Sequence, residues 1–132
     1  MRYIIRDYDP EQDGRLVVSS WVAGFLDLTE ADGAPARAAA RALVDRLIER
    51  SSVRVLCSAT DSRHILGWAA AEGDCLHWVY VKAGPLLRRQ GLGTALVEDA
   101  GRPTLASITT RVCRPGKRCW AKWGLTYDPR SL

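Results

Sequence analysis

The sequence contains no long hydrophobic run. Its apolar stretches are short, for example Trp68 to Ala71, whereas a membrane-spanning helix needs about 20 consecutive apolar residues. The start of the chain also lacks the apolar core and the small-residue cleavage site of a secretory signal, and carries charges instead at Arg2, Arg6, Asp7 and Asp9. We therefore expect a cytoplasmic protein that does not bind a membrane.

Cysteine and histidine are too sparse and too irregularly spaced to predict a disulfide framework or a metal site. The chain has four cysteines and two histidines. Zinc sites use paired spacings such as Cys-x2-Cys or His-x3-His, whereas Cys113 and Cys119 are six residues apart. Cys57 and Cys75 stand in apolar, strand-like segments, where a thiol behaves as a small hydrophobic side chain. We expect no metal.

Length and composition indicate one folded domain. The chain has 132 residues, of which 47% are apolar and 26% charged, and these values are typical of a globular domain. No internal repeat and no low-complexity tract interrupts it. We predict a single domain that spans residues 1–132.

Positive charge is concentrated in the C-terminal half. Residues 1–66 carry nine basic and ten acidic side chains, while residues 67–132 carry ten basic and five acidic ones. Such an excess favours an anionic partner, although spaced basic residues are also common on an ordinary solvated surface. Because Trp120 is interleaved with the basic residues of the segment 111–122, nucleic acid is one candidate partner for that segment.

Apolar residues recur at helical and strand spacings along the whole chain. Helical spacing predicts amphipathic helices at about 12–26 and 35–50. Alternating and β-branched apolar residues, separated by turn residues, predict strands. We expect strands at 3–6, 53–57, 65–72, 75–82, 104–112 and 125–127, a helix from residue 91 to about 101, and a short helix at 115–123.

The most specific local pattern is a strand followed by a glycine-rich turn that opens a helix. The turn is the segment Arg88-Arg89-Gln90-Gly91-Leu92-Gly93-Thr94. Glycine lets the backbone approach a ligand closely, and the unpaired amides at a helix N-terminus bind anions. We therefore predict that this turn binds phosphate.

Two common phosphate-binding motifs do not fit the turn. A dinucleotide-binding G-x-G-x-x-G sequence would need its third glycine where Leu96 stands. A Walker P-loop needs a lysine followed by Ser or Thr after its last glycine, whereas Gly93 is followed by Thr94 and Ala95. The remaining pattern is R-x-x-G-x-G, beginning at Arg88.

This pattern resembles the R/Q-x-x-G-x-G/A motif of the GCN5-related N-acetyltransferases (the GNAT family), through Arg88, Gly91 and Gly93. The expected order of helices and strands is similar to that of the family over nearly the whole chain. The segment 120–125 resembles the family's closing Y-x-K-x-G-F sequence. More loosely, the strand at 77–82 and the small size are similar to members encoded by tailed bacteriophages.

The resemblance implies a single-domain GNAT-like α/β (α+β) fold with a mixed, mostly antiparallel sheet flanked by about four helices. The sheet is expected to splay between the strands at 75–82 and 104–112, and acetyl-CoA, a cosubstrate, to bind in the splay. Val79 and Val81 would bond the pantetheine through their backbones. The pyrophosphate would be held by the turn and its charges, that is by Arg88, Arg89, Gln90, Gly91, Leu92, Gly93 and Thr94.

The family's chemistry is direct transfer of an acetyl group to an amine of a small molecule or a protein, which needs a base and a proton donor. His77 lies on the strand expected to flank the acyl group, and imidazole titrates near neutral pH. An unbroken strand would place it on the face of Val79 and Val81, and a bulge would change that. Glu72 and Asp74 are alternative bases.

One residue departs from the family pattern. Trp120 occupies the position of the tyrosine that usually protonates the thiolate, and an indole cannot act as a general acid at neutral pH. Tyr80 or Tyr127 would have to replace it, or water would. A nucleic-acid-directed protein that binds DNA or modifies a base, and a non-catalytic coenzyme-binding or structural module, remain alternatives. The sequence names neither the acceptor amine nor the oligomeric state, and a dimer is one option.

Overall fold

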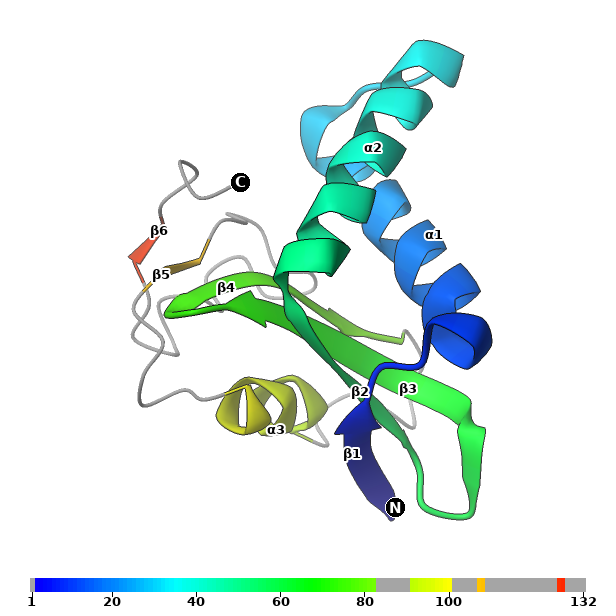
Figure 1. Ribbon diagram of the computed structural model, residues 1–132, viewed down its shortest axis with the longest axis vertical. Helices are drawn as coiled ribbons and strands as arrows, with labels where there is room; N and C mark the ends of the chain where they lie inside the picture. The colour runs from blue at the N-terminus through cyan, green and yellow to red at the C-terminus, as the bar shows by residue number, and fades with distance from the viewer. Residues whose placement is uncertain (1, 83–90, 101–106, 109–125, 128–132) are drawn as a thin grey trace.

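A computed structural model describes residues 2–82, 91–100, 107–108 and 126–127. In this part of the chain, three helices and six strands follow one another in a mixed α/β order (Figure 1). The elements are β1 (Tyr3–Asp7), α1 (Pro10–Thr29), α2 (Ala34–Arg50), β2 (Ser52–Ser58), β3 (Asp61–Glu72), β4 (Cys75–Val81), α3 (Leu92–Asp99), β5 (Ser107–Ile108) and β6 (Thr126–Tyr127).

Local sequence signals fix the ends of α1. The side chain of Asp9 accepts a hydrogen bond of 3.0 Å from the backbone amide of Glu11, and Pro10 occupies the first turn, where its missing N–H costs nothing. The helix ends at Glu30, which adopts a left-handed conformation with φ of 53°. α2 follows after a short connection, so the two helices form a hairpin.

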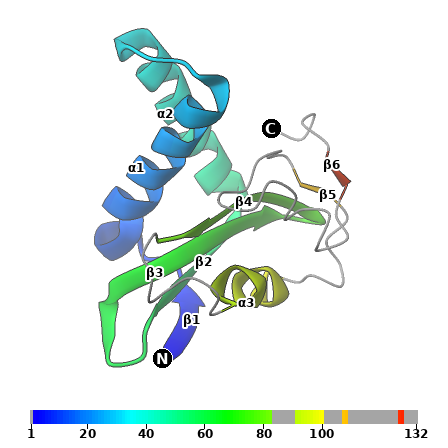
Figure 2. The same ribbon diagram turned by 180° about the vertical axis from the view of Figure 1, so that it is seen from behind.

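The strands form one sheet in the order β1-β2-β3-β4-β5-β6. The first four strands are antiparallel to their neighbours, whereas β4 pairs with β5, and β5 with β6, in parallel. α1 and α2 cover one face of the sheet and α3 lies on the other, as both views show (Figures 1 and 2). The sheet is therefore the middle layer of three.

The central strand β3 contributes to two hydrophobic cores. Trp68 and Ala70 pack into the core under α1 and α2, while Leu66 and Ala69 pack with Leu96 of α3 on the other face. The whole run from 65 to 71 is buried, because both faces of the strand are covered. The sequence therefore shows a continuous apolar run there and not an alternation.

The observed elements confirm the predicted α/β class and the mixed, mostly antiparallel sheet. α1 begins two residues earlier than expected and ends three later, and β3 begins at Asp61 and not at residue 65. The expected short helix at 115–123, and most of the strand expected at 104–112, lie outside the described residues. No helix in the described part of the chain is long and apolar enough to cross a membrane.

Candidate functional site

An ion-paired cluster joins the end of α2 to the hairpin of β3 and β4. Nε2 of His77 lies 2.9 Å from Oε1 of Glu72, and Nη2 of Arg50 donates to the same oxygen at 3.0 Å. His77 is fully buried, whereas the side chains of Glu72 and Arg50 are about 40% exposed, at 38% and 41%. Hydrogen bonds from Arg50 and from His77 hold the pKa of Glu72 below its ordinary value, so the carboxylate is ionised at neutral pH.

His77 occupies a β-bulge. Trp78 pairs with Ala70 and Leu76 pairs with Ala71, so β4 has one extra residue, His77, between two consecutive pairs of the ladder. A bulge of this kind changes the direction of a side chain relative to regular alternation. The expectation that His77 shares a face with Val79 and Val81 assumed regular alternation, and the bulge interrupts that alternation.

The described pairing between β4 and β5 ends next to this bulge. β4 pairs with β5 at Cys75 and Leu76, and no other described residue pairs with that edge. The amide of Lys82 bonds the carbonyl of Leu66, and backbone groups alternate in direction along an antiparallel strand. The amides and carbonyls of Val79 and Val81 therefore point away from β3, toward the side of β5.

The N-terminus of α3 presents backbone amides that have no partner within the helix. Gly91 is the N-cap, it has φ of 71°, and no side chain caps the helix. The first intrahelical bond joins the amide of Ala95 to the carbonyl of Gly91, so the amides of Leu92, Gly93 and Thr94 have no acceptor within the helix. A Cβ built on Gly91 would meet no atom within 4 Å, so there is open space at the helix start.

The start of α3 and the end of β4 lie together. Leu92 is buried in the core between α3 and the sheet, and Val79 and Val81 pack against the same core. The open backbone edge of β4 and the uncapped amides of α3 therefore belong to one region of the molecule. Of the predicted coenzyme-binding residues, the structure describes Val79, Val81 and 91–94, while Arg88, Arg89 and Gln90 lie outside the described residues.

The two candidate proton donors lie in different places. Tyr80 stacks on Trp68, with ring centroids 6.2 Å apart, on the face covered by α1 and α2. It is thus on the opposite face from the side chains of Val79 and Val81. The backbone of Tyr127 pairs with Ile108, which pairs with Leu76, so Tyr127 lies two strands, or about 10 Å, from β4. Trp120 and the basic segment 111–122 lie outside the described residues.

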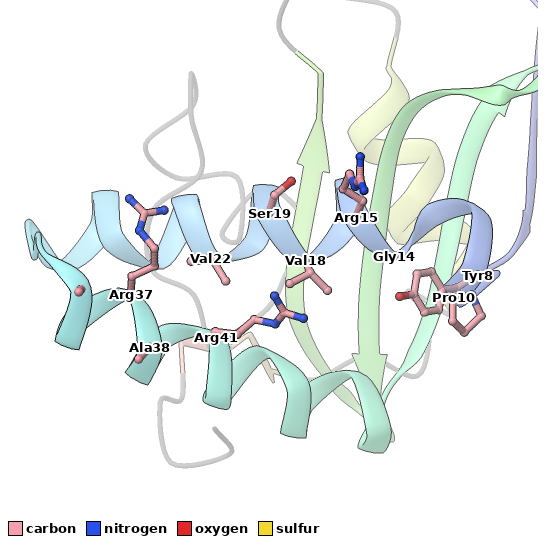
Figure 3. A pocket seen from close by; sticks show the side chains of 11 residues that line it. Tyr8, Pro10, Gly14, Arg15, Val18, Ser19, Val22, Arg37, Ala38 and Arg41 are labelled. Carbon is pink, nitrogen blue, oxygen red and sulfur yellow. The ribbon is translucent and has the colours of Figure 1, made fainter.

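A separate groove runs between α1 and α2 (Figure 3). It has a volume of about 860 Å³, and it is lined by side chains from both helices and by Tyr8, which precedes α1. Three of the lining residues are arginines, namely Arg15, Arg37 and Arg41. The groove is formed by the helix pair and not by β4 or α3, so it is not the site predicted from the glycine-rich turn.

Arg50 and the groove arginines were not identified from the sequence. Arg50 and Glu72 are 22 positions apart, and each looks like an ordinary polar residue at the end of an element. Their pairing arises because the end of α2 packs beside the hairpin of β3 and β4, which no local spacing indicates. Cys57 and Cys75 are both buried, and no group of metal-ligating side chains gathers among the described residues.

No protein-family model matches the chain, and no curated protein matches it either. Solved structures do match, although at low identity. An acetyltransferase structure with acetyl-CoA from Clostridium acetobutylicum, described as predicted, has a TM-score of 0.63 at 15% identity and covers 99% of this chain and 94% of that one. Glucosamine-6-phosphate N-acetyltransferase from Arabidopsis thaliana has a TM-score of 0.54 at 12% identity, with coverages of 97% and 94%.

A GCN5-related N-acetyltransferase from Rhodopseudomonas palustris has a TM-score of 0.50 at 20% identity and covers 79% of this chain. The chain spans 66% of that protein and 65% of YjaB from Escherichia coli, which is just under two thirds of each. The architecture is a three-layer α/β sandwich. More narrowly, it is the GNAT fold, as the R-x-x-G-x-G pattern predicted.

Proposed function

We propose that the protein is an N-acyltransferase that transfers an acetyl group from acetyl-CoA to an amine of a small molecule or a protein. The observation that carries the proposal is the juxtaposition of two sets of backbone groups that no described residue pairs with, at the edge of β4 beyond Leu76 and at the start of α3. Backbone groups on a strand edge suit the amides of a pantetheine arm, and helix N-terminal amides suit a pyrophosphate. The residues present therefore fit the coenzyme.

The binding residues have distinct tasks. The amides of Leu92, Gly93 and Thr94 hold the pyrophosphate, aided by the glycine conformation at Gly91, which leaves the space in front of the helix clear. Backbone groups of Val79 and Val81 orient the pantetheine arm. When bound, acetyl-CoA supplies the activated thioester.

His77 is the proposed base. The acceptor nitrogen forms the new C–N bond while the C–S bond breaks, the amine proton passes to His77, and the thiolate takes a proton from Tyr80, Tyr127 or water. Nε2 of His77 lies 2.9 Å from Oε1 of Glu72, and this contact holds the imidazole ring in one orientation. Glu72 and Arg50 are thus positioning residues. Asp74, in the turn that joins β3 to β4, is the remaining alternative base.

The coenzyme site is tested by calorimetric titration of acetyl-CoA and desulfo-CoA into Gly91→Leu and Gly33→Leu. Gly91 has φ of 71° and ψ of 21°, in the left-handed helical region, whereas Gly33 has φ of 93° and ψ of 169°, a region that is nearly specific to glycine. The control variant therefore suffers at least as much backbone strain as Gly91→Leu. We expect Gly91→Leu alone to lose binding, because its side chain fills the space in front of α3. Unchanged micromolar affinity in Gly91→Leu would exclude a pyrophosphate site there.

The catalytic assignment is tested with His77→Gln, which keeps a hydrogen-bond partner for Glu72 but removes the base. Loss of general-base catalysis predicts a kcat lower by about 100-fold with coenzyme affinity retained. Glu72→Gln is expected to lower kcat more than it changes the KM for acetyl-CoA, and Glu72→Asp to restore part of the rate. Equal turnover in His77→Gln and the wild type would remove His77 from the mechanism.

The complete burial of His77 favours a second candidate function, a module that binds the coenzyme without transferring its acyl group. A buried imidazole reaches an acceptor amine only if that amine enters the interior of the protein. Tight coenzyme binding without turnover across a panel of primary amines would support this second function. Measurable acetylation of any amine in the panel would contradict it.

A further inference from the structure

We infer that the groove between α1 and α2 docks an extended acidic peptide segment of a partner protein. The first observation is its charge. Arg15 comes from one wall and Arg37 and Arg41 from the other, and the described residues of the lining include no aspartate or glutamate. Neither Arg15 nor Arg37 forms an ion pair with any described residue, so both guanidinium groups are available to an anionic ligand.

The second observation is the distribution of that charge. In Figure 3 the side chains of Arg37, Arg41 and Arg15 follow one another along the groove and do not gather at one point. A single phosphate would require convergent donors, whereas spaced cations suit a chain that carries several carboxylates. Arg41 is also held 3.1 Å from Asp45, which limits its conformations without removing it from the groove.

The dimensions of the groove fit a short extended peptide. The α1 residues that line it run from Pro10 to Val22, a rise of about 18 Å, which corresponds to about five residues of extended chain. Arg37 and Arg41 are one helical turn apart, or about 6 Å along the axis. Alternate side chains of an extended peptide are spaced by about the same distance, so an acidic residue at every second position matches the arginines.

The floor of the groove favours a peptide over nucleic acid. It is formed by small aliphatic side chains, which include Val18, Val22 and Ala38, and these suit apolar residues between the acidic ones. Single-stranded nucleic acid is held largely by stacking on aromatic rings, and Tyr8 is the one aromatic residue among the described residues of the lining. The groove does not involve β4 or α3, so this inference is independent of acyl transfer.

Fluorescence anisotropy with a fluorescein-labelled Val-Glu-Val-Glu-Val-Glu peptide at low salt tests the inference. Arg37→Glu is compared with Arg46→Glu, which makes the same change of charge at another exposed position of α2 that does not line the groove. We expect Arg37→Glu to weaken binding about tenfold, because it replaces a charge-assisted contact by repulsion, and Arg46→Glu to change it little. Ala38→Trp, which fills the groove without a change of charge, is expected to weaken binding to a similar extent.

Any of the following three outcomes would overturn the inference that the groove docks an acidic peptide. Equal weakening by Arg37→Glu and Arg46→Glu would show diffuse attraction to a basic surface and no docking site. Tighter binding of a thymidine hexanucleotide than of the peptide, with the same dependence on Arg37, would identify nucleic acid as the occupant. No binding of the peptide at millimolar concentration would exclude the site. Circular dichroism of each variant checks that the fold is intact.

Discussion

Replacement of Gly24 by alanine is expected to destabilise the protein, although the same change usually stabilises a helix. Gly24 lies in α1, directly over the indole of Trp78 on β4. A Cβ built on Gly24 would overlap Cζ2 of Trp78 and would lie 2.9 Å from its Cη2 and 3.1 Å from its Cε2. Trp78 is 7% exposed and its ring lies 5.0 Å from that of Phe25, so it has little room to move away.

The magnitude follows from two opposing effects. Alanine in a helix interior gains about 1 kcal/mol over glycine, whereas forcing an extra methyl group into a packed layer costs up to about 3 kcal/mol. We therefore expect Gly24→Ala to lower the free energy of unfolding by about 2 kcal/mol, or Tm by about 8 °C for a domain of this size.

A double-mutant cycle measured by urea unfolding tests the explanation. Trp78→Phe removes the six-membered part of the indole, so Gly24→Ala should stabilise the Trp78→Phe protein by up to about 1 kcal/mol. Gly14→Ala is the control in the same helix, because its Cβ would meet only the hydroxyl end of Tyr8, at 3.2 Å. Destabilisation by Gly24→Ala of the same size in both backgrounds would refute the proposed contact with Trp78.

Two further predictions concern other buried contacts. Asp13 is fully buried and accepts hydrogen bonds from Arg6 at 2.7 and 2.8 Å, so Asp13→Asn should lower the free energy of unfolding by about 2 kcal/mol at neutral pH. Burial raises the pKa of Asp13, but the contacts with Arg6 and the Asp9 amide outweigh burial and lower the pKa. The wild type is therefore more stable than Asp13→Asn above about pH 4, and this difference in the free energy of unfolding disappears as the pH falls further. Acid titration of both proteins measures it. Gly67→Ala would place a Cβ 2.5 Å from the carbonyl oxygen of Tyr80 and 3.2 Å from Cδ1 of Leu96, and is expected to cost about 2 kcal/mol. It should also weaken acetyl-CoA binding through the displaced α3, and calorimetry showing unchanged affinity would contradict this link.

The sequence predicted the order of elements well because most of its signals are local. Asp9 and Pro10 mark the start of α1, Gly73 and Asp74 mark the turn before β4, and the glycine pattern marks the start of α3. The first part of β3 was missed because residues 61–64 are exposed and polar. Asp61 pairs with Ser58 of β2 across an irregularity in the register, and the periodicity of residues 61–64 does not encode that pairing.

The candidate site was predictable only in part. The positions of Val79, Val81 and 91–94 follow from a motif within one βα unit. The contact between Arg50 and Glu72, by contrast, depends on how α2 packs beside a hairpin, and the bulge at His77 depends on the register of two strands. The groove arginines belong to the polar faces of two helices, and the sequence does not indicate that these faces meet.

The different sizes of neighbouring residues in β3 also protect the protein against misfolding. Trp68 points toward α1, where Ser20 accepts its indole proton at 2.9 Å, while the adjacent Gly67 leaves room for Leu96 on the other side. A slip of one position in the pairing of β3 would turn Trp68 toward α3 and into the space that Leu96 fills. Such a mispaired arrangement is sterically blocked, so the small and large neighbours favour a single alignment of β3 with β2 and β4.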